Sequence, residues 1–442
     1  MLPSVLNIGP FSIHSLRVSM ARAGAALAGG YRLGHSRRRM LAALVALGMA
    51  GGGAAWSGLA AAQTANPGAQ PLRIGLIGPF TGPSADFGMP MHNGVRLAVD
   101  EINAAGGYLG RPLELVVKDD TAKPDVGRKL SEELVADKVA ATIGFCNTGV
   151  AQQSLEVFQN ARIPLLIPCA TGTPLTSKYP APESYIFRTS ARDAIQAPFI
   201  VQDIAKRGWT QVAVFADTTG YGEAGLKDVE AALAARQLKP VYVARFATGV
   251  KDLGPELQAA RQAGANVIVG YTLGPENAVI AKGRKAMKWD VPFVGPWTLS
   301  FPFFIDGAKE AAEGALMVQT FIAEPSNERR ASFLANYARK FNATKISVPV
   351  AAAQGYDTAY LLMHALFGVR ATQLDGPAIK TALENIQRNY YGVVATYEKP
   401  FSASDKDAVS ANMLYLGQVK NGAVTFAYPE DAKRNLFVQR KQ

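Results

Sequence analysis

The sequence has few of the residues on which catalysis and metal binding most often depend. Four histidines and two cysteines occur in 442 residues. No GxSxG, HExxH or Walker A motif and no zinc-ligand spacing is present. His14 and His35 lie in a segment expected to be removed, which leaves His92 and His364 far apart in the chain. We therefore expect no enzyme activity, no cofactor and no metal.

Two cysteines are also too few for a disulfide framework. Cys146 and Cys169 each follow an apolar segment, ATIGF and PLLIP, so their thiols lie close together if those segments are neighbouring strands. A bond between aligned parallel strands is geometrically demanding. Two free thiols are the expected state, with a disulfide as the alternative in an oxidising compartment.

Acidic residues are absent from the amino terminus, and positive charge is concentrated there. The chain carries 46 Lys and Arg against 35 Asp and Glu, a formal charge of +11. Residues 1–62 contain six of the arginines, so the remainder has 40 basic and 35 acidic groups, or +5. Without a concentrated basic surface or interleaved aromatic residues, the sequence does not indicate a nucleic-acid partner.

The same segment has the pattern of an export signal. Arginines at 37–39 precede an uncharged stretch, and the small residues Ala60–Ala62 offer a cleavage site before Gln63. The stretch is long enough to span a membrane, but its many Gly and Ala residues favour cleavage over a retained anchor. Both a twin-arginine and a Sec signal fit the pattern, and Met20 is an alternative start. We expect a periplasmic protein, cleaved near Ala62.

The next segment reads as a strand, a loop and a helix. Leu72–Ile77 is a nearly continuous apolar run, as expected of a parallel strand covered on both faces. The loop GPFTGPSADFG follows, and then Val95, Ala98, Val99 and Ile102 give a helix one apolar stripe. Ligands of open α/β sheets bind at the carboxyl ends of the strands, so we expect this loop to contact one.

Strand and helix patterns then alternate, which predicts βαβ units and parallel sheets. Two sheets are expected, because a strongly twisted sheet rarely exceeds about ten strands. The segment Phe187–Asp193 interrupts the pattern and is a natural crossing between them. The further expected strands are Leu113–Lys118, Val139–Phe145, Ile163–Pro168, Tyr185–Thr189, Val212–Ala216, Val241–Phe246, Val267–Tyr271, Pro292–Val294 and Leu316–Phe321.

Together these features resemble a known family. The loop GPFTGPSADFG, the helix ending in DEINAAGG, and Asp119 and Asp120 after the next strand are similar to the opening signature of type I periplasmic solute-binding proteins, the branched-chain amino acid receptor group of ABC importers. The resemblance covers roughly residues 71–430. It implies two Rossmann-like α/β lobes with parallel sheets, joined by three hinge crossovers in a Venus-flytrap arrangement.

The resemblance also implies where the lobes divide. Later crossings are expected near Gln319–Glu324 and Tyr390–Tyr397. Beyond the signal peptide and upstream segment at 1–62, the amino-terminal lobe would comprise residues 71–189 and 322–392, and the carboxy-terminal lobe residues 190–321 and 393–442.

Two loops can present backbone N–H groups to a ligand. Asn147, Thr148 and Gly149 lie between a strand and a helix start, where a carboxylate is favoured, although simple capping of the helix explains the same residues. The second loop follows the next strand and contains Cys169, Ala170 and Thr171.

Two other polar stretches have competing interpretations. In the opening loop, Ser84 and Phe87 could face a ligand, or the loop could be a turn rich in Gly and Pro for backbone reasons alone. Asp119 and Asp120 could suggest a metal, but no third carboxylate or histidine is near in sequence. Capping and hydrogen bonding near the hinge are the expected role of this pair.

The resemblance assigns roles to several of these residues. Phe87 stands where the family's receptors carry an aromatic lid over the ligand. Positions matching Thr148, Ala170 and Thr171 hold the α-carboxylate and the amine of an amino acid. From the other lobe, Tyr221 and Tyr271 match aromatic contacts, although a tyrosine after a strand is also common as a core residue.

Trp297 departs from the family pattern. In the receptors that the chain resembles, a carboxylate follows a Gly-Pro pair at this strand end and pairs with the ligand's ammonium group, whereas here Gly295-Pro296 precedes Trp297. An indole can stack on an aromatic ring but cannot supply that charge. The resulting hypothesis is a ligand that is a carboxylate without an α-amine, aromatic or aliphatic. Alternatively, Trp297 packs between the lobes and Glu276 or Asp306 supplies the acid.

As a whole, the sequence predicts an exported receptor that closes around a small carboxylate or amino-acid-like solute. It would act as a monomer and deliver the solute to the permease subunits of an ABC transporter. Contacts with both lobes would favour the closed state, so hinge closure would supply affinity. A ligand sensor for amides, urea or amino acids that acts on a regulator is the alternative.

Overall fold

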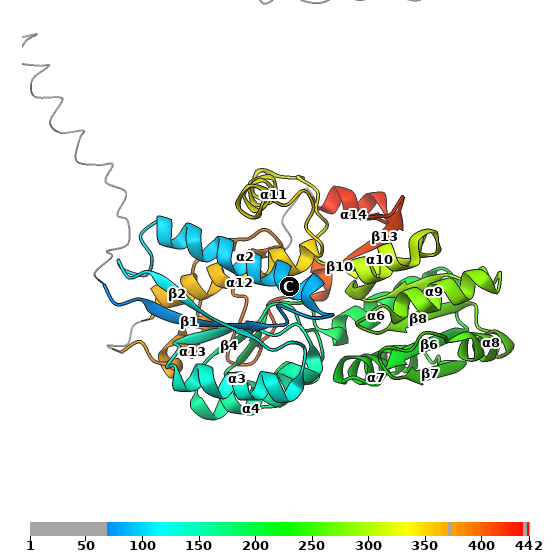
Figure 1. Cartoon of the computed structure of the whole chain (residues 1–442), viewed down its shortest axis with the longest axis horizontal. Helices are drawn as coiled ribbons and strands as arrows, with labels where there is room; N and C mark the ends of the chain where they lie inside the picture. Colours follow the sequence, from blue (N-terminus) through cyan, green and yellow to red (C-terminus); the bar gives the residue numbers. More distant parts are fainter. Residues whose placement is uncertain (1–68, 370–372, 436–439, 442) are drawn as a thin grey trace, which may run out of the picture. The chain divides into compact units, whose positions relative to one another are not determined.

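The computed structural model describes residues 69–369, 373–435 and 440–441. Within these residues, strands and helices form two α/β lobes, each built on its own sheet (Figure 1). The predicted signal peptide and its cleavage site lie outside the described residues.

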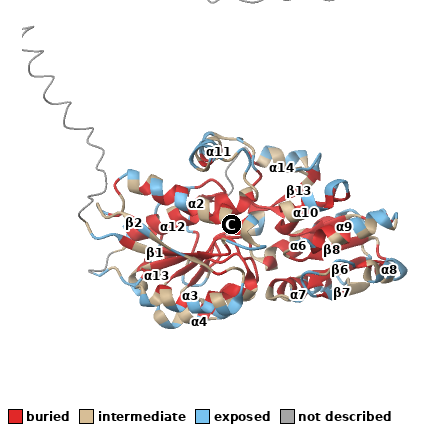
Figure 2. Ribbon diagram, in the orientation of Figure 1, coloured by how far each residue is buried: buried red, intermediate tan, exposed pale blue. Residues whose placement is uncertain are grey.

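The first lobe is built on a parallel sheet with strand order β2-β1-β3-β4-β5. Neighbouring side chains of β1 point to opposite faces: Leu76 packs with α2 and α12, and Ile77 packs with α3 and α4. Both faces are therefore covered (Figure 2). The strands are β1 (Leu72–Gly78), β2 (Leu113–Asp119), β3 (Ala141–Gly144), β4 (Leu165–Ile167) and β5 (Ile186–Arg188); the helices are α2 (Ala85–Ala104), α3 (Pro124–Ala136), α4 (Thr148–Ala161), α5 (Pro174–Ser177), α11 (Glu328–Phe341), α12 (Pro349–Gly368) and α13 (Gly376–Glu384).

The second lobe has the strand order β14-β13-β10-β9-β8-β6-β7. Its strands again alternate: Val214 faces α6 and α7, and Phe215 faces α8 and α9. The strands are β6 (Val212–Asp217), β7 (Tyr242–Phe246), β8 (Val267–Tyr271), β9 (Phe293–Gly295), β10 (Leu316–Gln319), β13 (Tyr415–Lys420) and β14 (Ala423–Phe426); the helices are α6 (Asp193–Lys206), α7 (Gly220–Ala234), α8 (Gly254–Gln262), α9 (Glu276–Ala286), α10 (Pro302–Ala308) and α14 (Pro429–Arg434).

All ten predicted strands are present, with ends that move by no more than a few residues. The predicted parallel sheets are present, and the second sheet adds an antiparallel edge, in which β13 pairs antiparallel with both β10 and β14. The strands β13 and β14 are joined by Asn421-Gly422, and both residues have positive φ, +52° and +70°. This is the geometry of a tight hairpin turn, which Asn-Gly favours.

The chain passes between the lobes three times. The first passage runs from Arg188, which ends β5, to Asp193, which begins α6, and the second follows Gln319 at the end of β10. Before the third, a short hairpin of β11 (Tyr390–Tyr391) and β12 (Thr396–Tyr397) forms, and Asp407 then bridges to Arg188 beside β5. We propose that the third passage follows this bridge; the predicted lobe boundaries otherwise remain a prediction.

Candidate functional site

The two loops singled out in the sequence converge at one edge of the first sheet. β3 and β4 pair in parallel, so the segments that follow them emerge side by side. The backbone N–H of Ala170 donates to the carbonyl oxygen of Phe145 at 3.0 Å, which ties one loop to the other.

Cys146 and Cys169, which lie in these two loops, form a disulfide, and their Cα atoms are 4.5 Å apart. The prediction of two free thiols is therefore wrong. It expected two aligned strands to run up to the residues just before the cysteines, Phe145 and Pro168, but β3 ends at Gly144 and β4 at Ile167. Phe145 has a φ of +69°, a left-handed conformation that turns the chain away from the strand direction before Cys146.

The beginning of α4 is not capped by a side chain. Asn147 has the extended backbone of a capping residue, but its Nδ2 donates to the Ser84 hydroxyl at 3.4 Å and its Oδ1 is buried without a partner. The Thr148 hydroxyl accepts a hydrogen bond from the Gly172 N–H at 3.2 Å. The N–H groups that start this helix are therefore available to an anion.

Gly149 in this helix meets Gly220, the first residue of α7 in the other lobe. A Cβ atom on Gly220 would lie 3.0 Å from the Gly149 Cα and 2.5 Å from the Gln152 Oε1. The absence of a side chain at Gly220 thus lets the backbones of α4 and α7 touch. The amino-terminal ends of α4 and α7, one from each lobe, are thus adjacent.

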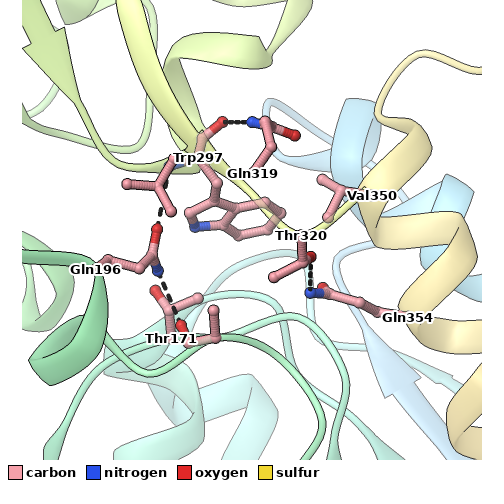
Figure 3. A pocket seen from close by; sticks show the side chains of 9 residues that line it. Thr171, Gln196, Trp297, Gln319, Thr320, Val350 and Gln354 are labelled. Carbon is pink, nitrogen blue, oxygen red and sulfur yellow. Dashed lines mark hydrogen bonds between the residues drawn. The ribbon is translucent and has the colours of Figure 1, made fainter. Parts of the chain in front are cut away.

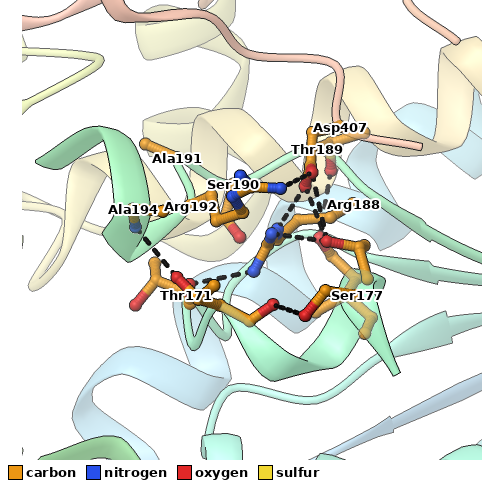
Figure 4. Close-up of polar contacts among 12 residues, drawn as sticks. Thr171, Ser177, Arg188, Thr189, Ser190, Ala191, Arg192, Ala194 and Asp407 are labelled. Carbon is orange, nitrogen blue, oxygen red and sulfur yellow. Dashed lines mark hydrogen bonds and ion pairs between the residues drawn. The ribbon is translucent and has the colours of Figure 1, made fainter. Parts of the chain in front are cut away.

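The loop that contains Thr171 is held from behind by Arg188 (Figure 4). This fully buried guanidinium donates to the carbonyl oxygens of Thr171 and Gly172 at 2.9 and 2.8 Å, and its Nε donates to Asp407 at 2.6 Å. The Thr171 hydroxyl is buried and has no partner. The protein therefore occupies the carbonyl groups of this loop, whereas the hydroxyl lies near the Asp193 carboxylate without a hydrogen bond of good geometry.

From the second lobe, Tyr221 on α7 and Tyr271 at the end of β8 contribute a pair of packed rings, whose centroids lie 5.2 Å apart. Both side chains are buried, and neither hydroxyl group makes a hydrogen bond of good geometry. The Tyr271 hydroxyl lies near Asp193 and the Tyr221 hydroxyl near Thr298. Gly225 on α7 makes room for them, since a Cβ atom there would lie 1.9 Å from the Tyr271 ring. Burial raises the pKa of both phenols, so each keeps the proton that it can donate.

Asp193, the first residue of α6, is a carboxylate to which no sequence pattern pointed. It is completely buried; its Oδ1 accepts from Gln196 at 3.1 Å, and its Oδ2 has no partner. Burial raises the pKa of Asp193 to about 7, against the opposing effect of the Thr171 hydroxyl, and Asp228 raises it further. No ion pair joins it to a Lys or Arg in the part of the chain that the structure describes.

Trp297 lies between the two lobes, where it begins a short 3₁₀ turn (Figure 3). Its backbone N–H donates to Gln196 at 3.3 Å, and its carbonyl oxygen accepts from Gln319 at 3.5 Å. The indole N–H is buried and has no partner. Trp297 therefore adds a free donor and an apolar face where the family pattern has an acid.

Phe87 extends this aromatic surface from the first lobe. Its ring stacks on Phe301 at 5.0 Å between centroids, and Phe301 meets the indole of Trp297 edge-on at 4.8 Å. These three side chains are buried and connect α2 with the second lobe. The position agrees with an aromatic cover over a ligand, and that role remains a prediction.

Comparison with known proteins places the chain in a family. The sequence pattern of the family described as periplasmic binding protein matches residues 71–423. The chain belongs to this family. It is 27% identical over 263 residues to the leucine-, isoleucine-, valine-, threonine- and alanine-binding protein of Pseudomonas aeruginosa, a match that covers 59% of this chain and 70% of that protein. The predicted resemblance to branched-chain amino acid receptors is confirmed.

Solved structures agree on the fold. A periplasmic binding protein type 1 from Bordetella pertussis Tohama I matches with a TM-score of 0.73 and 22% identity, over 81% of this chain and 99% of that one. The substrate-binding protein of a branched-chain amino acid transporter from Streptococcus pneumoniae, solved with isoleucine, matches with a TM-score of 0.68 and 24% identity, over 80% and 98%. The type I fold with two α/β lobes is thus established for this binding protein.

Between the lobes, the binding protein encloses a cavity of about 10 Å³, room for a single water molecule. The cavity, here called the inner cavity, is lined by Thr171, Gln196, Trp297, Gln319 and Gln354, among others. Asp193 adjoins it through Thr171 and Gln196. The lobes are therefore close together, and the inner cavity has no room for a solute larger than water.

Other candidate groups lie apart from the inner cavity. Asp119 accepts hydrogen bonds from the N–H groups of Phe80 and Thr121, as expected of a loop-holding residue. The Glu276 carboxylate is held by the Gly249 N–H, and Asp306 is exposed on α10. The described residues contain no group of three His, Cys, Asp or Glu placed to hold a metal, and no helix among them is long and apolar enough to cross a membrane.

Proposed function

We propose that this protein is the extracytoplasmic substrate-binding component of an ABC importer and that it binds an amino acid between its lobes. Its membership of the periplasmic binding protein family and its similarity to a receptor named for five amino acids support the general role. The choice of an amino acid rests on the side chains around the inner cavity.

For the acid end of the solute, we assign the uncapped start of α4 and the nearby hydroxyl groups. The free N–H groups of α4, with Thr148 and Thr171 beside them, offer donors without a fixed positive charge. Carboxylates bind favourably at such helix termini. The free N–H of the Trp297 indole is a further donor on the opposite lobe.

For the amine end, we assign Asp193, and this single observation carries the proposal. Its Oδ2 is buried and makes no hydrogen bond of good geometry, although the hydroxyl groups of Thr171 and Tyr271 lie near the carboxylate. Such burial is costly unless a ligand completes the site. An ammonium group would satisfy that oxygen and restore the charge of the carboxylate. Asp193 therefore replaces the acid that is missing at Trp297, and we favour an α-amino acid over a carboxylate without an amine.

Closure would follow from the division of the site between two lobes. Thr148 and Thr171 belong to the first, whereas Tyr221, Tyr271 and Trp297 belong to the second. A solute that contacts both sets favours the arrangement in which they are close. We expect ligand-free protein to populate a more open state as well, visible as a larger radius of gyration in small-angle scattering.

Calorimetry with matched ligand pairs tests the assignment. Leucine is compared with 4-methyl-2-oxopentanoate, and phenylalanine with phenylacetate. The amino acid of each pair should bind more tightly, and Asp193→Asn should weaken amino acid binding at least tenfold while changing the oxo acid little.

The matched control is Asp120→Asn. Asp120 is also buried, its pKa is also raised to about 7 by burial, and its Oδ2 also lacks a partner, but it lies in the turn before α3. This control should leave affinity unchanged. Tighter binding of the oxo acids, with no effect of Asp193→Asn, would overturn the amino acid assignment, and uptake unaffected by deletion of the protein would overturn the import role.

A further inference from the structure

A second cavity adjoins the inner cavity, on the other side of Gln319. Its volume is about 370 Å³, and we call it the outer chamber. Most of its lining is apolar, including Ile305, Phe321, Ile322, Leu334 and Ile346. Small-molecule sites usually have volumes from roughly 300 to 1,000 Å³, so the outer chamber has the capacity that the inner cavity lacks.

Both lobes and the second passage between them form the outer chamber. Ile305 comes from α10 in the second lobe, and Leu334 and Ala338 come from α11 in the first. Phe321 and Ile322 follow β10, where the chain changes lobe. A group bound in the chamber would contact both lobes and would favour closure, as expected of part of the solute.

Gln319 separates the two spaces. Gln319 lines both cavities, and within the described part of the chain its side chain makes one hydrogen bond, from Nε2 to the Trp297 carbonyl oxygen at 3.5 Å. Such a long hydrogen bond is weak. Rotation of this one side chain would join the inner cavity to the outer chamber without a change in the backbone.

The charges at the edge of the chamber are few and of opposite sign. Asp306 and Lys345 line it and are exposed to solvent. They therefore give the chamber no net charge, and its interior favours an uncharged apolar group.

We propose that the outer chamber receives the apolar tail of the solute, whose polar end is held beside Asp193. This inference rests on the proposed function and narrows it: the preferred solute carries a straight or aryl side chain longer than that of leucine. The tail passes Gln319 and ends among the apolar side chains of α10 and α11.

A chain-length series tests the proposal. The affinities of norvaline, norleucine, 2-aminooctanoate and 2-aminodecanoate are measured by calorimetry, with the unbranched fatty acids of the same lengths as a second series. Each methylene group that enters an apolar chamber should tighten binding about fourfold. The gain should continue beyond norleucine, and Gln319→Ala should increase it for the two longest ligands.

Ala338→Phe fills the chamber from α11 and should remove that gain while leaving norvaline unchanged. Ala335→Phe is the matched control, because Ala335 is also exposed on α11 but does not line the chamber. If affinity did not change with chain length while Asp193→Asn still weakened the binding of short amino acids, the proposed role of the outer chamber would be wrong and the proposed function would stand. If neither the amino acids nor the fatty acids bound, both the proposed function and the role of the outer chamber would be wrong.

Discussion

Thr173 in the first lobe donates its hydroxyl hydrogen to Asp228 of α7 in the second lobe, at an oxygen–oxygen distance of 2.6 Å. The same hydroxyl oxygen accepts the N–H of Ala194 at 2.9 Å. Burial raises the pKa of Asp228, and the bond from Thr173 opposes that rise. One side chain thus joins the loop after β4 to the opposite lobe, at a distance possible only when the lobes are close together.

We expect Thr173→Val to weaken ligand binding about tenfold, because the closed state loses a hydrogen bond to a charged group, which contributes roughly 1.5–3 kcal/mol. Calorimetry and small-angle scattering check the result; the ligand-free variant should be more open than the wild type. Ser177→Ala, which removes an exposed hydroxyl bound to the Thr173 carbonyl oxygen, is the control. Equal affinity in both variants would contradict a role in closure.

Removal of the Cys146–Cys169 disulfide should lower the free energy of unfolding by about 3 kcal/mol, since the bond closes a loop of some two dozen residues. Urea denaturation of the Cys146→Ser, Cys169→Ser double variant measures the loss. Dithiothreitol should destabilise the wild type by a similar amount and leave the double variant unchanged. Equal stability of oxidised and reduced wild type would refute the prediction.

Arg188→Met should destabilise the protein by about 3–5 kcal/mol, because Asp407 would remain buried without its strongest partner. Ligand binding should weaken as well, since Arg188 also holds the carbonyl groups of Thr171 and Gly172. Arg192→Met removes a half-exposed arginine that pairs with the same Asp407 at 3.2 Å, and it should cost less than about 1 kcal/mol. Denaturation curves of both variants decide whether the two arginines differ in this way.

The raised pKa of Asp193 predicts a specific pH dependence. The folded, ligand-free protein retains a proton on Asp193 up to about pH 7, whereas an unfolded chain loses it near pH 4. The folded state binds more protons in this interval, so stability falls as pH rises, by up to about 1.4 kcal/mol per pH unit. Asp193→Asn should flatten the profile; Asp120 contributes in the same direction and remains in that variant.

Ligand binding should show the complementary effect. An ammonium group beside Asp193 lowers the pKa of the carboxylate, so the complex releases a proton when it forms below about pH 7. Calorimetry of an amino acid in two buffers with different ionisation enthalpies measures that proton. Proton uptake in place of release would indicate that the ligand brings a negative charge to Asp193.

The sequence predicts the framework of the molecule well, because buried parallel strands leave a strong local signal. Leu72–Gly78 is nearly continuous in apolar residues, and its position before a glycine-rich loop indicates the edge of the sheet at which a ligand is expected. The residues chosen in the loops at 147–149 and 169–171 do lie together, because β3 and β4 are neighbours. Such inferences need only the rule that parallel strands end at the same edge.

What the sequence does not predict depends on contacts between distant residues. The raised pKa of Asp193 results from burial of its carboxyl group beside Thr171 and Tyr271, and no local pattern in the sequence indicates that burial. The disulfide depends on the left-handed turn at Phe145, an uncommon conformation for that residue type. The β13–β14 hairpin is a different case: Asn421-Gly422 is a recognisable turn signal, but β13 and β14 are not among the strands predicted from the sequence.

The contact between Gly149 and Gly220 would limit how far the lobes close. Because a Cβ atom at Gly220 would lie 3.0 Å from the Gly149 Cα, the two main chains leave little room for a closer approach. Adaptable side chains can repack around solutes of different size, but a backbone stop is the same for all of them. Solutes that differ in their tails would therefore produce one and the same closed outline, which is the surface that a transport partner could recognise.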